Sequence, residues 1–388
     1  EAARLRRKYP DMILSSRMVR RKKPIPGIGK WKPKSRWCLA GHSDPDTAEL
    51  VTFAPTPSSE GLMAFLQVSL NLSHTFAFCD VKNAFCQSDK LVRKGGPLFA
   101  QPCEGLHLGD DALIIIDVLI EVDDFIVTAL PELQSKLKEA FQARFTFGKW
   151  EENEAEYAGR MIKVHPGFIH IDQEKYLTEQ VRPVALAKHR RSCKQDPLNS
   201  EEFEAFRSAI YKVNWVAKET RPEVAGMASI LASKLKSAVI EDVLVLNKNI
   251  NFLRNTAARP LTIWKMDARE MAFVVVSDAG GIGAKHDTTD ELDLPADSTQ
   301  GAWMVFAAEA LPLGNMKVRA SPLAWRSSKL RRKVFSTFGG ETQAMLQGIS
   351  EADWLQIMVR DAVQHDVELR QWRNSLSPHM VVMKGDLH

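Results

Sequence analysis

Residues 75–85 read TFAFCDVKNAF, and residues 112–129 read ALIIIDVLIEVDDFIVTA. Both stretches are rich in aromatic and β-branched residues, which favours β-strands, yet both carry acids inside their apolar runs. Asp80 lies in the first stretch, and Asp123 with Asp124 separates VLIEV from FIVTA in the second. Two apolar runs around adjacent aspartates predict a tight β-hairpin with these aspartates near its turn.

Ionised carboxylates are seldom buried among apolar side chains without a partner. A shared divalent cation would offset the desolvation cost, and magnesium prefers one or two carboxylates together with phosphate oxygens. Two such ions can activate a hydroxyl and stabilise a leaving pyrophosphate. The alternative is that Asp123 and Asp124 are ordinary turn residues, since Asp is common in turns. Taken alone, the pattern favours this alternative.

The rest of the chain mixes helical and strand-like patterns, which predicts an α+β protein. Helices are expected over 62–72, over 131–145 and, with a break near Arg221-Pro222, over 201–256. Two short strands are expected around the HPG turn at 165–167, and the polar stretch 185–200 is the first candidate boundary. A second α/β core is expected from 258 onward, with four strand-like runs and a final helix after Gly340.

The composition of the 388 residues, 45% hydrophobic and 26% charged, is that of a globular protein. No apolar run approaches the roughly 18 residues of a membrane span. Five cysteines without C-x-x-C spacing argue against a disulfide framework or a structural zinc site. Because the chain begins with Glu1 and shows no charged n-region before an apolar run, we expect an internal segment without a secretory signal.

Positive charge is concentrated at the start of the chain. Residues 1–36 carry 13 Lys/Arg and two acids, a net charge of +11, whereas the rest carries 39 basic and 46 acidic residues, a net charge of −7. Prolines and glycines break this basic segment, so irregular structure or short strands are expected there. On charge alone, a solvated or localisation-like tail and nucleic-acid binding are equally supported.

The order of several motifs resembles the Pol polyprotein of copia-type LTR retrotransposons, from about residue 13 to 360. FAFCDVKNAF (76–85), VLIEVDDFIVTA (118–129) and the run from FTFGKW to QEKYL (145–177) resemble its reverse transcriptase. The segment 32–58 is similar to the fingers, and 206–235 is similar to the connecting helices. VVVSDAGG, DSTQGAWMVF, LAWRSSK and STFGGETQAM, between 274 and 345, are similar to its ribonuclease H domain.

The resemblance implies an α+β fold in which an incomplete palm/fingers polymerase domain precedes a helical connection and a ribonuclease H-like α/β domain that is truncated at its C-terminus. The expected segments are a basic arm, the fingers and palm, the connection and the ribonuclease H-like domain, over 1–36, 13–185, 200–257 and 258–388, respectively. The implied partners are an RNA template, a DNA primer and deoxynucleoside triphosphates, without a membrane.

By this resemblance, Asp80, Asp123 and Asp124 are the catalytic acids that bind two Mg²⁺ ions, and Asp123 is the more critical of the adjacent pair. Phe85 matches an aromatic that packs under the incoming sugar and excludes a 2′-hydroxyl; an ordinary core phenylalanine is an equal alternative. Lys34 and Arg36 match the fingers and would contact template or triphosphate. The basic segment is then expected to bind phosphates, with an affinity that falls with salt.

In the second core, Asp278 ends the strand FVVVSD, and Glu341 opens the last expected helix. The resemblance makes them catalytic, metal-binding carboxylates for hydrolysis of RNA in a hybrid. Glutamate is also favoured in the first turn of any helix, which is a strong alternative for Glu341. Ser298, Thr299 and Gly301 match a turn with a structural role.

The chain departs from the family pattern at three places. Glu121 replaces the aromatic before the aspartate pair, and only 43 positions separate Asp80 from Asp123. This interval lacks the motif and helix that position template and nucleotide, and losing them would harm catalysis. No third ribonuclease H aspartate with a preceding strand is expected among Asp353, Asp361 and Asp386.

Three functions therefore stay open. The first is an RNA-directed DNA polymerase with a ribonuclease H-like domain, whose activity the short interval would impair. The second is a non-catalytic nucleic-acid-binding remnant of a retrotransposon. The third is a metal-dependent nuclease that acts only on RNA/DNA hybrids and depends on Glu341 but not on Asp123.

Overall fold

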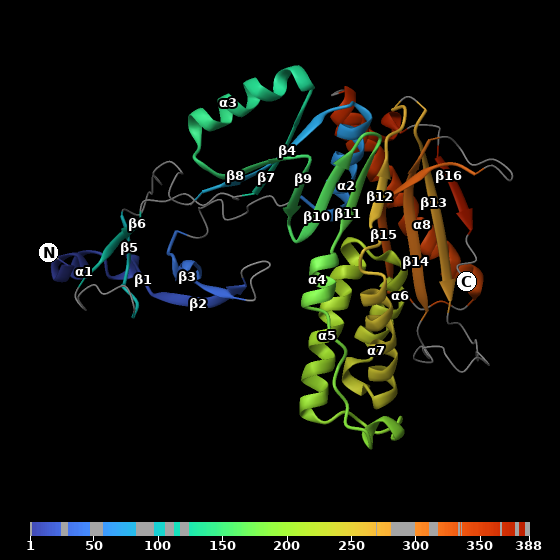
Figure 1. Ribbon diagram of the computed structural model, residues 1–388, viewed down its shortest axis with the longest axis horizontal. Helices are drawn as coiled ribbons and strands as arrows, with labels where there is room; N and C mark the ends of the chain where they lie inside the picture. Colours follow the sequence, from blue (N-terminus) through green and yellow to red (C-terminus); the bar gives the residue numbers. More distant parts are fainter. Residues whose placement is uncertain are drawn as a thin grey trace. The chain divides into compact units, whose positions relative to one another are not determined.

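The protein is described by a computed structural model and is α+β, as the sequence predicts (Figure 1). It folds into two compact units. The first comprises Glu1–Thr56, Val81–Asp123 and Arg144–Gly148, and the second comprises Pro57–Asp80, Asp124–Ala143 and Lys149–His388. The structure describes residues 2–24, 30–46, 57–82, 97–104, 112–116, 124–268, 270–280, 299–309, 317–332, 334, 336–364, 367–376 and 380–384.

Among its described residues, the first unit contains α-helix α1, two short 3-10 helices and two small sheets. Helix α1 (Ala2–Lys8) precedes a sheet in which β5 lies between a parallel β1 and an antiparallel β6. These strands are β1 (Ile13–Leu14), β5 (Leu98–Ala100) and β6 (Ile114–Ile116). The basic segment forms a regular antiparallel ribbon of two nine-residue strands, β2 (Ser16–Pro24) and β3 (Trp31–Leu39). The ribbon is longer and more regular than the sequence suggested.

The second unit contains the sheet that carries the first predicted aspartate. Its order is β7-β4-β8, with β4 (Thr75–Val81), β7 (Asp124–Ala129) and β8 (Phe147–Glu152). Helix α3 (Gln134–Arg144) connects β7 to β8 where an amphipathic helix was predicted. FIVTA lies in β7 and pairs with β4. Its expected hairpin partner, VLIEV at 118–122, lies outside the described residues.

A second, fully antiparallel sheet has the order β12-β11-β10-β9. Its strands are β9 (Glu154–Tyr157), β10 (Arg160–His165), β11 (Phe168–Asp172) and β12 (Leu261–Trp264). The two strands around the HPG turn are confirmed, and α4 (Glu174–Glu179) follows them. The structure differs at β12, which was expected to open the second core but pairs with β11. Leu261 and Ile263 are buried in the same core as Ile169 and Ile171, which explains this pairing.

Three helices form a bundle with a core of its own. Helices α5, α6 and α7 lie side by side in Figure 1 and span Ser200–Glu219, Ala225–Ser233 and Ile240–Asn255. The predicted break near Arg221-Pro222 separates α5 from α6. Asn199 caps α5 through a capping box with Glu202. Among the helices that the structure describes, none is long and apolar enough to cross a membrane.

The third sheet is mixed and has the order β15-β14-β13-β16. Strand β13 is antiparallel to β14 and parallel to β16, and β14 is antiparallel to β15. The strands are β13 (Ala272–Gly280), β14 (Gln300–Ala308), β15 (Ala320–Lys329) and β16 (Met380–Lys384). The last predicted helix is α8 (Thr337–Gln364), which begins before Gly340 rather than after it.

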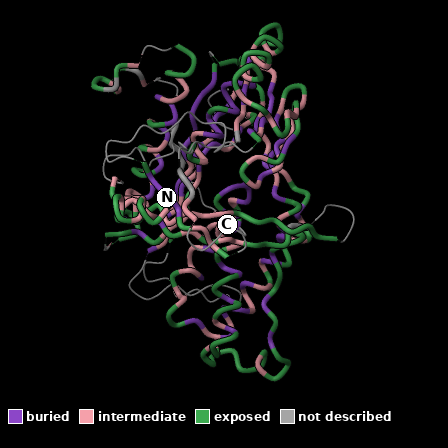
Figure 2. The backbone as a smooth tube through the Cα atoms, turned by 90° about the vertical axis from the view of Figure 1, so that its left-hand side faces the viewer, coloured by how far each residue is buried: buried purple, intermediate pink, exposed green. Residues whose placement is uncertain are grey.

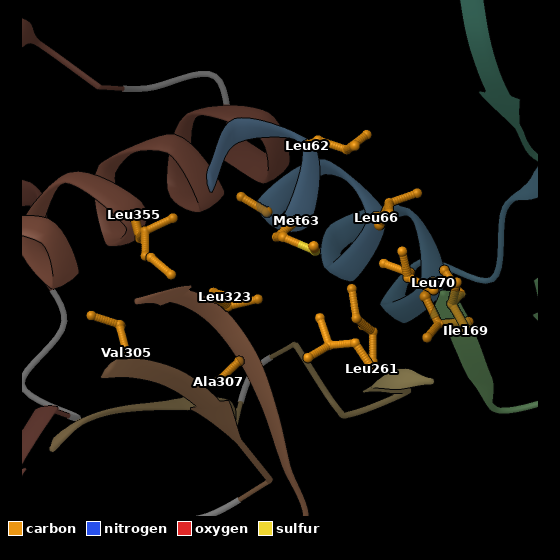
Figure 3. Close-up of a cluster of buried hydrophobic side chains, with 14 of the residues drawn as sticks. Leu62, Met63, Leu66, Leu70, Ile169, Leu261, Val305, Ala307, Leu323 and Leu355 are labelled. Atoms are coloured by element: carbon orange, nitrogen blue, oxygen red, sulfur yellow. The ribbon is translucent and has the colours of Figure 1, made fainter. Parts of the chain in front are cut away.

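Helix α2 (Ser59–Asn71) joins two of these sheets through one hydrophobic core. Figure 3 shows Leu62, Met63, Leu66 and Leu70 of α2 in this core. On one side they meet residues of the antiparallel sheet, and on the other they meet residues of the mixed sheet and of α8: Ile169, Leu261, Val305, Ala307, Leu323 and Leu355. Figure 2 marks the buried positions along the backbone in purple. The second unit is therefore built around a core that both sheets share.

Gly348 shows how closely α8 packs on β13. Alanine normally stabilises a helix interior by about 1 kcal/mol relative to glycine. A Cβ at Gly348, however, would lie 2.7 Å from Cγ1 of Val275 and 3.1 Å from Cβ of Trp303. We expect Gly348→Ala to lower the free energy of unfolding by about 1–3 kcal/mol, measured as a lower urea midpoint.

The matched control is Gly41→Ala, because a Cβ at Gly41 would meet no atom within 4 Å. Its effect is expected to stay within about 0.5 kcal/mol. A stability gain in Gly348→Ala would show that the helix–sheet contact is looser than the structure indicates.

Candidate functional site

Asp80 and Asp124 lie opposite each other on neighbouring strands. In the antiparallel pair of β4 and β7, the register runs from Thr75 with Ala129 to Asp80 with Asp124. Residues directly opposite in such a pair have Cα atoms about 4.5–5.5 Å apart. Two aspartates that are 44 positions apart in the sequence therefore meet at one end of this strand pair.

The local sequence explains why Asp80 lies at the edge of a core rather than inside it. Side chains alternate between the two faces of a strand, so Phe76, Phe78 and Asp80 share one face of β4. Phe76 and Phe78 are buried in the same core as α2, whereas Asp80 is half-buried at the end of this row. An acid in this position has an apolar wall on one side and access to solvent on the other.

The backbone register sets Asp80 opposite Asp124, and the structure describes Asp124 by its backbone only. The ions of a two-metal site lie about 4 Å apart. Carboxylate oxygens are the ligands that Mg²⁺ prefers. Asp123, Glu121 and Phe85 lie outside the described residues, so convergence of all three aspartates stays a prediction. Within the described part of the chain, no three His, Cys, Asp or Glu side chains form a metal-binding group.

The other face of β4 carries Cys79. Burial raises the pKa of this thiol to about 11, and the nearby Lys138 ammonium opposes this only in part. A thiol with such a pKa stays protonated at neutral pH and is a poor nucleophile. Lys138 lies 5.5 Å from the ring centroid of Trp150 and 3.6 Å from a carboxylate oxygen of Glu152. Cys79 is therefore not a candidate nucleophile, and the aspartates stay the candidate functional groups of this sheet.

Lys34 and Arg36 are both exposed on β3 in the first unit. They are two positions apart on one strand, so they lie on the same face of the ribbon. The structure thus presents both predicted phosphate-binding side chains to solvent together. Sequence reasoning missed that cations of β2 lie on this same face, because this depends on the strand register.

Asp278 and Glu341 lie on opposite sides of the mixed sheet. Val275 of β13 packs against Gly348 of α8, and Asp278, three positions later on the same strand, belongs to the other face. Glu341 and Ala344 recur with Gly348 at helical spacing and form the stripe of α8 that faces the sheet.

The face of Asp278 is the one covered by α6. Asp278 pairs with Ala302, which in turn pairs with Ser327 of β15. Gln300 Nε2 donates to Ser327 Oγ at 2.9 Å and to Ser229 Oγ of α6 at 3.0 Å. The Asp278 carboxylate accepts a hydrogen bond from the Ala279 backbone N–H at 2.8 Å. The structure therefore does not bring the two predicted ribonuclease H carboxylates onto one face.

One expectation about the third ribonuclease H acid was wrong. Asp353 and Asp361 lie within helix α8, so no strand directly precedes them in the sequence, and burial raises the pKa of Asp353. Asp386, however, follows β16 by two positions in the sequence, although it lies outside the described residues. The signal was the apolar run MVVM at 380–383, which pairs in parallel with β13. A strand precedes this aspartate after all.

Gly301, which the resemblance assigned to a turn, lies in β14 and packs closely against its neighbours. A Cβ there would lie 2.5 Å from Cδ2 of Leu330 and 3.4 Å from Cβ of Ala344 in α8. Thr299 is buried, and its carbonyl oxygen accepts a hydrogen bond from the Leu330 N–H at 2.8 Å. Ser298 lies outside the described residues.

No protein-family model matches the chain, and neither does any curated protein.

Proposed function

We propose that this chain is an RNA-directed DNA polymerase of retrotransposon type that joins deoxynucleotides by two-metal phosphoryl transfer. The observation that carries the proposal is the register of β4 and β7, which sets Asp80 opposite Asp124. The motif order across the chain supports it, because the two aspartates belong to motifs that resemble the polymerase acids. The substrates are an RNA template, a DNA primer and deoxynucleoside triphosphates.

The aspartates would act by holding and orienting charge. Asp80 and Asp124, with Asp123 as the resemblance implies, would hold two Mg²⁺ ions, and this metal pair would supply activation of the primer hydroxyl and charge stabilisation for the leaving pyrophosphate. The apolar wall of Phe76 and Phe78 keeps one side of Asp80 dry. Low dielectric strengthens the attraction between carboxylates and cations.

The ribonuclease H-like part of the proposal has weaker support. A mixed sheet with α8 on one face agrees with an α/β domain of this type, and so does the position of Asp278 near the end of β13. The opposite faces of Asp278 and Glu341 weigh against a shared metal site. We therefore expect hybrid cleavage by the unmodified chain to equal that by Glu341→Gln.

A second candidate is a non-catalytic nucleic-acid-binding remnant. Two observations favour it: the short interval of 43 positions between Asp80 and Asp123, and the exposed cations on the β2–β3 ribbon. Positioning supplies much of the rate in phosphoryl transfer, so a chain without the positioning helix can bind well and react slowly.

Primer extension tests these candidates. A labelled DNA primer on an RNA template is incubated with deoxynucleoside triphosphates, Mg²⁺ and either the unmodified chain or Asp123→Asn. Extension that disappears in Asp123→Asn supports the polymerase. If neither the unmodified chain nor Asp123→Asn extends the primer, and if both bind nucleic acid with an affinity that falls as salt rises, the result supports the remnant.

A parallel incubation with a labelled RNA/DNA hybrid separates the third possibility. Cleavage of the RNA strand that is lost in Glu341→Gln but kept in Asp123→Asn would identify a nuclease without polymerase activity.

A further inference from the structure

Two histidines lie close together on β10 and β11, which are side by side in Figure 1. His165 ends β10, His170 lies in the middle of β11, and their ring centroids are 5.2 Å apart. His165 pairs with Phe168, and Lys163 pairs with His170, so both histidines belong to one face of the sheet. The opposite face carries the isoleucines of the core, and both histidines are half-buried.

The separation of the two imidazoles is the one that a shared zinc ion requires. Zn²⁺ lies about 2.0–2.1 Å from a ligating nitrogen and about 3.2 Å from the centroid of that ring, so two rings on one tetrahedral ion have centroids about 5.2 Å apart. The planes of the two rings are inclined at 67°, so they do not stack face to face. Among the described residues, neither imidazole has a hydrogen-bond partner, which leaves the nitrogens of both rings available to a ligand.

Phe168 holds both imidazoles in place. Its ring centroid lies 4.7 Å from that of His165, in a stacked arrangement, and 4.6 Å from that of His170. Trp264 of β12 pairs with Phe168 and packs against its ring at 5.6 Å. Rings that are already held by their neighbours lose little freedom when they bind a ligand. The pair is therefore preorganised.

The charges around the pair are compatible with a bound cation. Neutral imidazole is the form that binds metals. Burial lowers the pKa of His170, and the nearby His165 adds to this effect. Lys163 also lowers this pKa, whereas Asp172 raises it. Lys163 Nζ lies 3.5 Å from Glu154 Oε1 of β9, which draws the ammonium to the side of β10 that is away from β11.

We infer that His165 and His170 together bind one borderline divalent metal ion of the class that includes Zn²⁺, with water in the remaining positions. Imidazole ligands suit Zn²⁺, Cu²⁺ and Ni²⁺, whereas Mg²⁺ prefers oxygen. The site goes beyond the proposed polymerisation, since it needs none of the aspartates of β4 and β7. An ion held by both strands stabilises the folded chain, because it links β10 to β11.

The test counts the Zn²⁺ ions that the full chain binds. The chain is titrated with zinc chloride in a calorimeter at about pH 7.5, above the ordinary histidine pKa of about 6.5. Excess Mg²⁺ is present to occupy carboxylate sites. His165→Gln and His170→Gln are each expected to bind one Zn²⁺ ion fewer than the unmodified chain, because a lone imidazole does not chelate. The double variant is expected to lose the same single ion and not two, since both side chains bind one ion.

Two further variants sharpen the result. His42→Gln is the matched control, because His42 is an exposed histidine of the first unit, and it is expected to bind as many ions as the unmodified chain. Phe168→Leu keeps both ligands but loses the ring that holds them. It is expected to bind the same number of ions with a Kd several-fold higher. The urea midpoint of each histidine variant shows that the chain is folded, and its effect on stability is expected to stay within about 0.5 kcal/mol.

The inference is overturned by any of three results: a zinc count that His165→Gln or His170→Gln leaves unchanged, a double variant that loses two ions, or an equal loss in His42→Gln. Asp80→Asn is expected to bind as many Zn²⁺ ions as the unmodified chain. Loss of extension with an intact zinc site thus separates failure of the polymerase proposal from failure of this one.

Discussion

Replacing Asp80 with Asn is expected to lower the rate of primer extension by about 10³-fold or more. Asn keeps the size of the side chain but removes the negative charge that holds a divalent cation. Metal ions contribute several kcal/mol of transition-state stabilisation, and each 1.36 kcal/mol is tenfold in rate. Extension under single-turnover conditions measures this loss, because it reports chemistry rather than primer release.

Asp172→Asn is the matched control for this loss. Asp172 is the last residue of β11, Asp80 is the last but one of β4, and both are half-buried. Its Oδ1 accepts a hydrogen bond from the Glu174 N–H at 3.0 Å, a role that the Asn amide oxygen can keep. We expect its extension rate to match that of the unmodified chain. An Asp80→Asn variant as active as this control would remove the carboxylate pair from the mechanism.

The second large effect is expected at a buried ion pair between β10 and α5. Arg160 and Glu219 side chains are each 8% exposed and bonded to each other. Ser59 of α2 donates from its Oγ to Glu219 Oε2 at 2.7 Å and accepts from Arg160 at 3.1 Å. Burial lowers the pKa of Arg160, which shows the cost of keeping this charge away from water.

Glu219→Ala would leave the Arg160 guanidinium buried without its carboxylate. We expect the free energy of unfolding to fall by about 3–5 kcal/mol, measured by urea denaturation. Removing both charges in Arg160→Met/Glu219→Leu is expected to recover much of this loss, because neither variant residue needs a partner.

A surface ion pair provides the comparison. Lys175 lies 2.9 Å from Glu156, and both side chains are more than half exposed. Glu156→Gln is expected to cost only about 0–1 kcal/mol. Equal costs for Glu219→Ala and Glu156→Gln would mean that the Arg160 site is open to water in solution.

Local patterns in the sequence predicted most helices and strands, because capping, periodicity and turns act over a few residues. The helices α2, α3 and α5 and the strands β10 and β11 all lie where periodicity places them. Strand partners could not be predicted in this way. β7 pairs with β4, and β12 pairs with β11 across almost 90 positions, since burial of a shared core selects these partners.

The same distinction between local patterns and tertiary packing applies to the residues of the candidate site. Apolar runs singled out Asp80 and Asp124 as unusual acids, and the register explains how they meet. The family resemblance singled out Asp278 and Glu341, but which face each residue occupies depends on packing between β13 and α8. A single sequence carries no direct signal for that packing. The apolar run MVVM before Asp386, by contrast, is a local signal that indicates a strand.

The shared core around α2 has a consequence for synthesis. Helix α2 is complete once residue 71 has left the ribosome, but Leu323 and Leu355, which cover its apolar face, follow 252 and 284 positions later in the sequence. Contacts of such long sequence separation form slowly, and apolar surface exposed in the meantime invites aggregation. We therefore expect chaperones to bind nascent chains that are stalled before residue 320. We expect these chaperones to dissociate once α8 has emerged.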